Sequence, residues 1–281
     1  MRRASLLLPL LAFAAAAPAR AQTELPSHPF RDLVHARSMA MGGAYRALGL
    51  GLETTVGNPA AMSLYQHYNL ELTGAWDLTQ RTAWAALGVM DSTNKLSAGV
   101  AYHLVSFGDL GDRTLAHLNT IALSTSFLDN LFIGASVHYL NSTGALQANA
   151  VTGDFGVMVR LLEWLSIGVA GHNLVDTRHP DFSTYFTAAA ALSNGTFSAL
   201  VDVRGEYREG DSPLLGFNAG GEFVIGEGFP IRAGFSMSEA GHTFVSGGLG
   251  WMFPGGAVDG AYRHELNGIG RAIALTIKIS N

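Results

Sequence analysis

Charged side chains recur at every second position in several stretches of the sequence. Asp202 and Arg204 are two residues apart, and Asp154 and Arg160 are six apart. In an extended chain, such even spacing places side chains on one face of a strand. Carboxylates and guanidinium groups on one face could line a polar path or dock another segment through ion pairs. The positions concerned are Glu71, Asp154, Arg160, Asp202, Arg204, Glu222, Arg232, Asp259 and Arg263.

Pairing between neighbouring strands is a simpler explanation for these charges. Opposite charges that face each other across adjacent strands stabilise a polar interior without any further role. Glu222 and Arg232 flank the turn-forming Glu227-Gly228 and are the best candidates for such a pair. We favour this interpretation over a polar path or a docking surface.

The residue types that usually perform nucleophilic or metal-dependent chemistry do not form a recognisable centre. His264-Glu265 lacks the second histidine of an HExxH helix, and no histidine stands at ligand spacing from another histidine or a carboxylate. The serines lie in alternating stretches, and no GxSxG turn occurs. We therefore expect no catalytic residues, no metal and no cofactor.

Residues 1–21 have the pattern of a cleavable signal peptide. Arg2 and Arg3 precede an apolar run, and Ala19-Arg20-Ala21 supplies small residues for cleavage.

The chain has no cysteine, so an exported protein of this kind must be stabilised by a large core or by a bilayer. Without Arg2, Arg3 and Arg20, 14 of the 17 basic residues remain against 22 acidic ones, a net charge of −8. No polybasic stretch is left, and nucleic acid is not an expected partner.

The elements that must position the charged residues are strands. From Tyr68 onward the sequence alternates, so that Val201 and Val203 share one face of a strand while Asp202 and Arg204 share the other. Charged residues make up only 14% of the chain, yet beyond the signal no apolar run is long enough for a spanning helix. These features predict an all-β protein, a closed antiparallel transmembrane barrel over residues 68–281. The expected strands, about fourteen of ~10 residues each, are 68–77, 81–90, 96–107, 116–128, 131–141, 150–162, 164–174, 184–193, 196–207, 214–225, 230–239, 242–252, 256–264 and 270–280.

The lengths of the connections predict an orientation. Short turns follow the even-numbered strands, and the longer links, around 108–115, 142–149, 175–183 and 208–213, follow odd-numbered ones. Outer-membrane barrels have short periplasmic turns and longer extracellular loops. We therefore expect a location in the cell outer membrane of a Gram-negative bacterium, with both termini on the periplasmic side.

Aromatic residues near strand ends suit the two interfacial girdles; they are Trp76, Tyr139, Trp164, Tyr207, Trp251, Phe253 and Tyr262.

Residues 22–67 do not alternate. They contain Gly42-Gly43 and, further on, Asn58-Pro59-Ala60, residue types that suit a compact and irregular backbone. Such a backbone cannot face lipid, so it must lie outside the bilayer or inside the barrel. We expect it to form a small N-terminal hatch.

The glycine-rich motifs in this segment resemble a known family. ARSMAMGGAYRAL at 36–48 and GNPAAMSLY at 57–65 resemble the N-terminal signature of FadL-like outer-membrane barrels, especially the PorV/PorQ branch linked to type IX secretion. The motifs AGGEFVIGEGFPIRAGFS, SGGLGW and VDGAYRHELNGIGRAIALTIKI are similar to the closing strands of that branch. The resemblance implies a fourteen-stranded barrel with a hatch whose motif comprises Gly42, Gly43, Asn58, Pro59 and Ala60.

The resemblance also implies a function. In FadL-type proteins the hatch gates the passage of hydrophobic molecules, whereas PorV-type barrels hold exported protein cargo. This chain departs from both groups, because its surface loops are short and it ends Lys278-Ile279-Ser280-Asn281 without a terminal aromatic residue. We expect a conduit or holder whose partners are outer-membrane lipid, the barrel-assembly machinery, and exported proteins or a hydrophobic ligand. The alternatives are a structural or assembly component of an envelope complex and, third, an outer-membrane lipid hydrolase.

Overall fold

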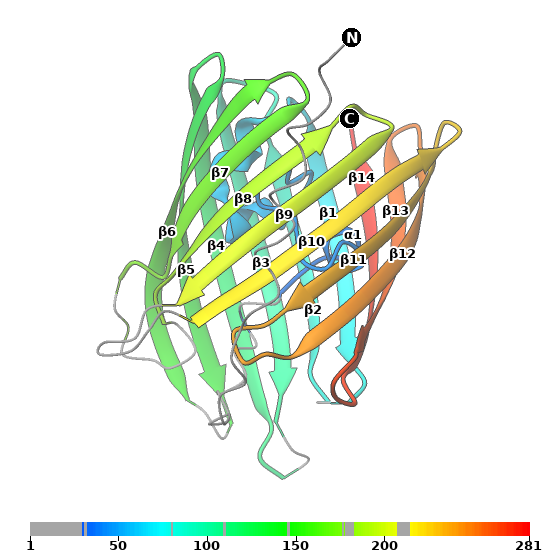
Figure 1. Cartoon of the computed structure of the whole chain (residues 1–281). Helices are drawn as coiled ribbons and strands as arrows, with labels where there is room; N and C mark the ends of the chain where they lie inside the picture. Colours follow the sequence, from blue (N-terminus) through cyan, green and yellow to red (C-terminus); the bar gives the residue numbers. More distant parts are fainter. Residues whose placement is uncertain are drawn as a thin grey trace.

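A single closed sheet of fourteen antiparallel strands forms a barrel (Figure 1). The computed structural model describes residues 30, 33–79, 81–108, 111–144, 147–175, 177, 183–206 and 214–281. The expected signal peptide, residues 1–21, lies outside these. Each strand pairs with its neighbours in sequence, and β1 closes the ring on β14. The predicted fold class and strand count are confirmed.

The strands begin and end within three residues of the expected positions. They are β1 Tyr68–Asp77, β2 Ala83–Asp91, β3 Leu96–Phe107, β4 Thr114–Leu128, β5 Leu131–Thr143, β6 Ala148–Leu162, β7 Leu165–His172, β8 Tyr185–Ser193, β9 Phe197–Glu206, β10 Leu214–Ile225, β11 Phe229–Met237, β12 Thr243–Phe253, β13 Gly256–Glu265 and β14 Arg271–Ser280. Two boundaries were wrong for a conformational reason. Arg81 has φ 54° and Asn173 has φ 53°, left-handed values that a strand cannot contain. Strand β2 therefore begins after Arg81, and β7 ends before Asn173.

The two ends of the barrel differ in their connections. Strand β1 begins where β14 ends, since Asn69 pairs with Ser280, and we call this the near end. The strand ends joined by short turns lie at the near end, whereas those joined by the longer links, such as the end of β7 and the start of β8, lie at the opposite, far end. This is the sorting of loop lengths that the sequence predicts.

Successive residues of each strand alternate between lumen and outer surface. The outer surface is apolar, with Leu72, Ile121, Val169 and Leu249 among its exposed residues. Six of the seven girdle aromatics are exposed on it, namely Trp76, Tyr139, Trp164, Trp251, Phe253 and Tyr262. Tyr207 lies outside the described residues.

Residues 33–64 fill the lumen, and we call them the lumen segment. They contain the helices α1 (Ala36–Ala40) and α2 (Thr54–Gly57) and the 3-10 helix η1 (Pro59–Ser63), and none of their residues is exposed. Helix α1 packs against β11–β14 and η1 against β3–β6, so the segment spans the barrel from one wall to the other (Figure 1). None of the described helices is long and apolar enough to cross a membrane.

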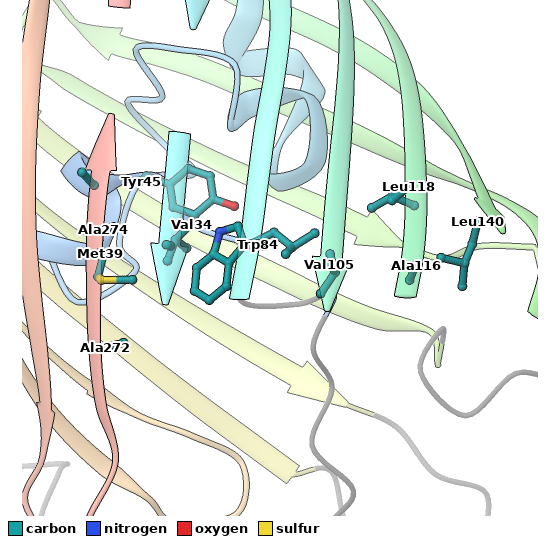
Figure 2. Packing of buried hydrophobic residues seen from close by; sticks show 13 residues of the cluster. Val34, Met39, Tyr45, Trp84, Val105, Ala116, Leu118, Leu140, Ala272 and Ala274 are labelled. Carbon is teal, nitrogen blue, oxygen red and sulfur yellow. The ribbon is translucent and has the colours of Figure 1, made fainter. Parts of the chain in front are cut away.

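Three apolar clusters join the lumen segment to the barrel wall, and the smallest contains Met62 with Met90 and Ala122 of the wall. A second contains Leu33, Val34, Met39 and Tyr45 together with Trp84 and other wall residues (Figure 2). The third contains Met41, Leu48 and Ala60 with Phe132 and Met158 of the wall. Burial of these side chains, at roughly 25 cal/mol per Å² of apolar surface, provides much of the energy that holds the segment in the lumen.

Candidate functional site

The candidate site is the contact between the lumen segment and the barrel wall. Its polar part includes four of the nine wall residues selected from the sequence, and these four bind the lumen segment. Asp202 on β9 accepts hydrogen bonds from the backbone amides of Tyr45 and Arg46, at 3.1 and 3.3 Å, and from Arg46 Nη1 at 3.1 Å. The side chains of Arg46 and Asp202 are 3% and 0% exposed. The pair is therefore a fully desolvated ion pair between segment and wall.

A second ion-pair network holds helix α1. Arg37 donates two hydrogen bonds to Glu222 on β10, from Nη2 at 2.9 Å and from Nε at 3.1 Å. Glu222 Oε2, which accepts from Arg37 Nε, also accepts from Arg232 Nε on β11 at 2.6 Å, so the predicted pair across the β10–β11 turn is confirmed. Arg232 Nη1 also donates to Asp259 on β13 at 2.6 Å. The network thus links the segment to three strands.

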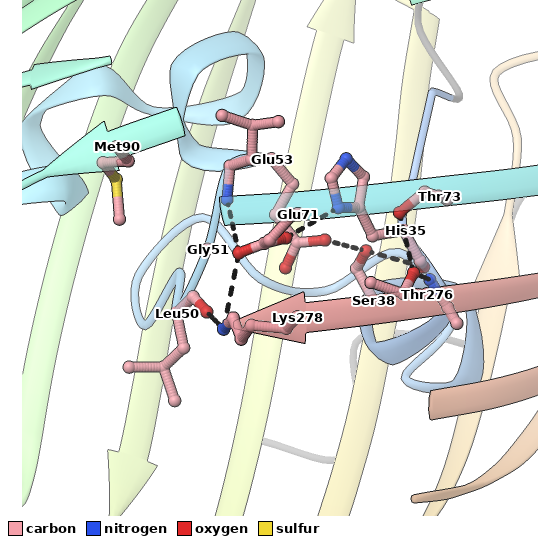
Figure 3. Close-up of polar contacts among 12 residues, drawn as sticks. His35, Ser38, Leu50, Gly51, Glu53, Glu71, Thr73, Met90, Thr276 and Lys278 are labelled. Carbon is pink, nitrogen blue, oxygen red and sulfur yellow. Dashed lines mark hydrogen bonds and ion pairs between the residues drawn. The ribbon is translucent and has the colours of Figure 1, made fainter. Parts of the chain in front are cut away.

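A third cluster lies where the first and last strands meet (Figure 3). Glu71 on β1 is the direct cross-strand partner of Lys278 on β14, and their charged atoms are 3.4 Å apart. His35 Nδ1 lies 3.0 Å from Glu71, and the amide of Leu52 donates to the same carboxylate at 3.0 Å. The amide of Ala36 donates to Thr276 of β14 at 3.0 Å. The lumen segment therefore contacts both strands of the closing seam.

Burial of His35 lowers its pKa, but the hydrogen bond to Glu71 and the charge of Glu71 more than reverse this effect. The pKa of His35 consequently lies above its usual value of 6.5. His35 therefore keeps its positive charge to a higher pH than a histidine ordinarily does.

The two glycines of the hatch motif allow close backbone packing. Gly42 and Gly43 have φ values of 68° and 82°. A Cβ on Gly42 would lie 2.4 Å from the carbonyl oxygen of Phe235, and one on Gly234 would lie 2.0 Å from the amide nitrogen of Gly42. Glycine is therefore required on both sides of this contact between segment and β11.

The Asn58-Pro59-Ala60 motif starts η1 at the near end. Asn58 Oδ1 accepts from the amide of Ala60 at 3.1 Å, and Asn58 Nδ2 donates to the carbonyl of Arg46 at 3.2 Å. Proline at the first position of a helix has no amide to satisfy. The backbone of β5 also packs closely against η1, since a Cβ on Gly134 would lie 2.5 Å from backbone atoms of Pro59 and Ala60.

The remaining wall residues of the prediction have separate partners. Arg160 donates to the carbonyl of Leu64 and lies over the rings of Tyr65 and Phe132. Asp154 lies between His138, at 3.1 Å, and His172, at 2.9 Å.

A small cavity of about 30 Å³ lies between the lumen segment and strands β9–β13. Arg46, Arg204 and Arg263 all line it. Arg204 pairs with Glu239, with Nη2 2.9 Å from Oε2, whereas Arg263 lies over the ring of Phe244 at 4.9 Å. The cavity holds little more than a water molecule, so a larger molecule could enter it only if the lumen segment or the surrounding side chains moved.

Our preference for pairing between neighbouring strands is only partly correct. Glu222–Arg232 and Glu71–Lys278 are such pairs, but Asp202, Glu222, Glu71 and Arg160 all bind the lumen segment. Sequence reasoning missed the partners on the segment, Arg37, Arg46 and His35, because irregular backbone gives no periodicity that assigns them a direction. Among the described residues, no three His, Asp or Glu side chains are placed to hold a metal ion.

Solved structures with a similar fold include two toluene transporters and a FadL homologue. The Ralstonia pickettii toluene transporter TbuX matches with a TM-score of 0.67 and 13% identity, over 88% of this chain and 98% of TbuX. The Pseudomonas putida toluene transporter TodX matches with a TM-score of 0.64 and 12% identity, over 88% and 97% of the two chains. A Pseudomonas aeruginosa FadL homologue matches with a TM-score of 0.56 and 12% identity, over the same shares.

No protein-family model matches the sequence, and no curated protein does so either. At 12–14% identity, the structural likeness establishes a shared FadL-type barrel fold. These three structures do not show a PorV/PorQ relationship.

Proposed function

We propose that this chain is an outer-membrane conduit for hydrophobic small molecules and that the lumen segment is its gate. The observation that carries the proposal is the way the lumen is closed. The segment crosses the lumen and is held by discrete ion pairs and hydrogen bonds, each of which can break and re-form. The shared fold with toluene transporters supports the same reading. In this proposal the near end faces the periplasm and the far end faces the outside.

A holder for exported protein, as in PorV-type barrels, is the second candidate and rests on the sequence resemblance alone. The packed lumen favours a small molecule, because a polypeptide would require most of the segment to leave. A crosslinking experiment in native membranes distinguishes the two candidates, since only the holder should retain exported proteins.

The gate can be tested with a reversible tether, because the chain has no cysteine of its own. Ser63 of η1 and Ser124 of β4 have their Oγ atoms 2.9 Å apart. A Ser63→Cys/Ser124→Cys variant should form a disulfide that fixes η1 to the wall. A matched control is Ser193→Cys/Ser198→Cys. The Oγ atoms of Ser193 and Ser198 are also 2.9 Å apart, but both residues lie on barrel strands.

The measurement is uptake of a hydrophobic probe such as toluene into proteoliposomes. We expect oxidation to reduce uptake at least several-fold in the Ser63/Ser124 variant, and a reductant to restore it, with no effect in the control. Equal uptake in the oxidised and reduced Ser63/Ser124 protein would contradict gating by the lumen segment.

A further inference from the structure

The cavity between the lumen segment and strands β9–β13 is lined by positively charged residues and by none of the described carboxylates. Arg46 lines it from the segment, whereas Arg204 and Arg263 line it from β9 and β13. Asn218 and Ser236, which are cross-strand partners on β10 and β11, add an amide and a hydroxyl group. Charged groups of one sign around a small enclosed space create a strong local potential. The cavity therefore favours an anion.

Arg263 supplies a positive charge that no carboxylate neutralises directly. Its guanidinium group lies over the ring of Phe244 at 4.9 Å and forms no ion pair within the described part of the chain. Its charge does act on Glu265. The Glu265 carboxylate, however, binds His242 at 2.6 Å and the amide of Gly270 at 2.8 Å. A guanidinium group stacked on an aromatic ring keeps its N–H groups available for an anion in the plane of the group.

Arg46 has an unused hydrogen-bond donor beside the same cavity. Its Nη1 donates to Asp202 at 3.1 Å and to the carbonyl of Gly43 at 3.3 Å. Its Nε is buried and has no partner among the described residues, and Arg46 as a whole is 3% exposed. Asp202 also has an unpaired oxygen, Oδ1, but Asp202 does not line the cavity. A buried donor without an acceptor is costly, so an acceptor in the cavity would be stabilising.

The size of the cavity restricts the kind of anion. Its volume of about 30 Å³ admits one particle the size of a water molecule. A chloride or bromide ion belongs to this size class, whereas a carboxylate with a hydrocarbon tail does not. The arrangement of charge and the available space thus favour a single monatomic ion.

We propose that this cavity is a binding site for one monatomic anion such as chloride. The ion accepts hydrogen bonds from Arg46 on the lumen segment and from Arg263 on the wall, and it neutralises the guanidinium group that has no carboxylate. Because it binds both sides of the contact, the ion holds the segment in its docked position. The site itself follows from the cavity, whereas its effect on passage rests on the proposed gate function.

Bromide is a direct probe of the site, because it carries the charge of chloride and gives an anomalous X-ray signal. Crystals of the mature barrel in sodium bromide should show an anomalous peak in contact with Arg46 and Arg263. Arg263→Gln should abolish this peak. Arg271→Gln, which removes an exposed arginine at the start of β14, should retain it. A wild-type cavity without bromide would overturn the site.

Tryptic cleavage after Arg46 measures whether the ion holds the segment. Rates are compared in chloride and in gluconate, an anion of the same charge that is too large for the cavity. The ionic strength is constant, and each rate is divided by that for a small peptide substrate to remove effects of salt on trypsin. Cleavage should be several-fold slower in chloride for the wild type and for Arg271→Gln. In Arg263→Gln the two rates should be nearly equal.

Heat-modifiable migration on a gel verifies that each variant is folded. A chloride effect of the same size in Arg263→Gln and the wild type would overturn the bridging role of the ion. Bromide in the cavity with equal cleavage in chloride and gluconate would confirm the site and overturn its hold on the segment.

These outcomes are separable from the test of the gate. If the Ser63/Ser124 tether controls uptake but the cavity binds no bromide, the anion site is wrong and the conduit stands. If bromide binds and chloride slows cleavage while the tether leaves uptake unchanged, the anion site stands and the lumen segment is not the gate.

Discussion

Asp202 is the wall residue whose replacement should loosen the lumen segment most. It accepts three hydrogen bonds from Tyr45 and Arg46, and its removal would leave the Arg46 guanidinium buried without a carboxylate. Removing one partner of a buried ion pair costs about 3–5 kcal/mol. Burial also raises the pKa of Tyr45 and keeps its phenol neutral. Tyr45 therefore cannot supply a negative charge in place of the Asp202 carboxylate.

We therefore expect Asp202→Asn to expose the lumen segment to trypsin, which cleaves after Arg37 and Arg46, both of them buried. The readout is the rate of cleavage at these two arginines in the detergent-solubilised barrel. Asp129→Asn, in the exposed turn between β4 and β5, makes the same chemical change away from the segment. Similar cleavage rates in the two variants would mean that the Arg46–Asp202 pair does not hold the segment.

His35 should make the docking of the segment depend on pH. Its pKa in the folded protein lies above 6.5, so the His35–Glu71 interaction is fully present below that value and is lost as the pH rises through the folded pKa. Glu53 raises this pKa further and Lys278 lowers it. The difference in urea stability between the wild type and His35→Gln should be about 1–3 kcal/mol at pH 6 and should shrink toward pH 9. A difference that stays constant over this range would assign His35 a neutral packing role.

At the scale of elements, the fit between α1 and the sheet depends on glycines that face the lumen. Gly220 and Gly221 are neighbours on β10 and face opposite sides. A Cβ on Gly220 would lie 2.3 Å from the carbonyl oxygen of Met41, whereas on Gly221 the nearest atom would be 3.8 Å away.

Gly220→Ala should therefore destabilise the docked segment by about 1–3 kcal/mol, since backbone must move to admit the methyl group. Gly221→Ala, which points outward, should change stability by no more than about 0.5 kcal/mol. Urea unfolding and tryptic cleavage at Arg46 measure both effects. Equal effects in the two variants would indicate that the substitution acts through strand propensity and not through the contact with α1.

At the scale of the whole molecule, the barrel has an apolar exterior and a closed ring of hydrogen bonds. Residues such as Leu87, Ile121 and Leu249 are more than half exposed on that exterior. We expect the mature protein to require detergent for solubility and to migrate faster on a gel before boiling than after it, because the closed sheet resists unfolding by detergent alone. Solubility without detergent, or identical migration, would be incompatible with a membrane barrel.

The alternation of residue types by itself determined the barrel. Period-two patterning fixes which residues share a face, and turn residues fix where strands end, so fourteen strands and the sorting of loop lengths were predictable. Local sequence also identified the charged lumen positions and the Glu222–Arg232 pair, whose members are joined by a single tight turn. The prediction was wrong at two strand ends. Arg81 and Asn173 adopt left-handed backbone conformations there, and the alternation of side-chain types does not encode them.

Only the tertiary structure decided what the lumen charges bind. Asp202 meets Arg46 across 156 residues and Glu222 meets Arg37 across 185, and no local pattern specifies such distant partners. The same holds for the glycines of the wall that admit the lumen segment. The sequence determines each strand through its own alternation, whereas the position of an aperiodic segment is determined by the complete surface that the closed barrel presents to it.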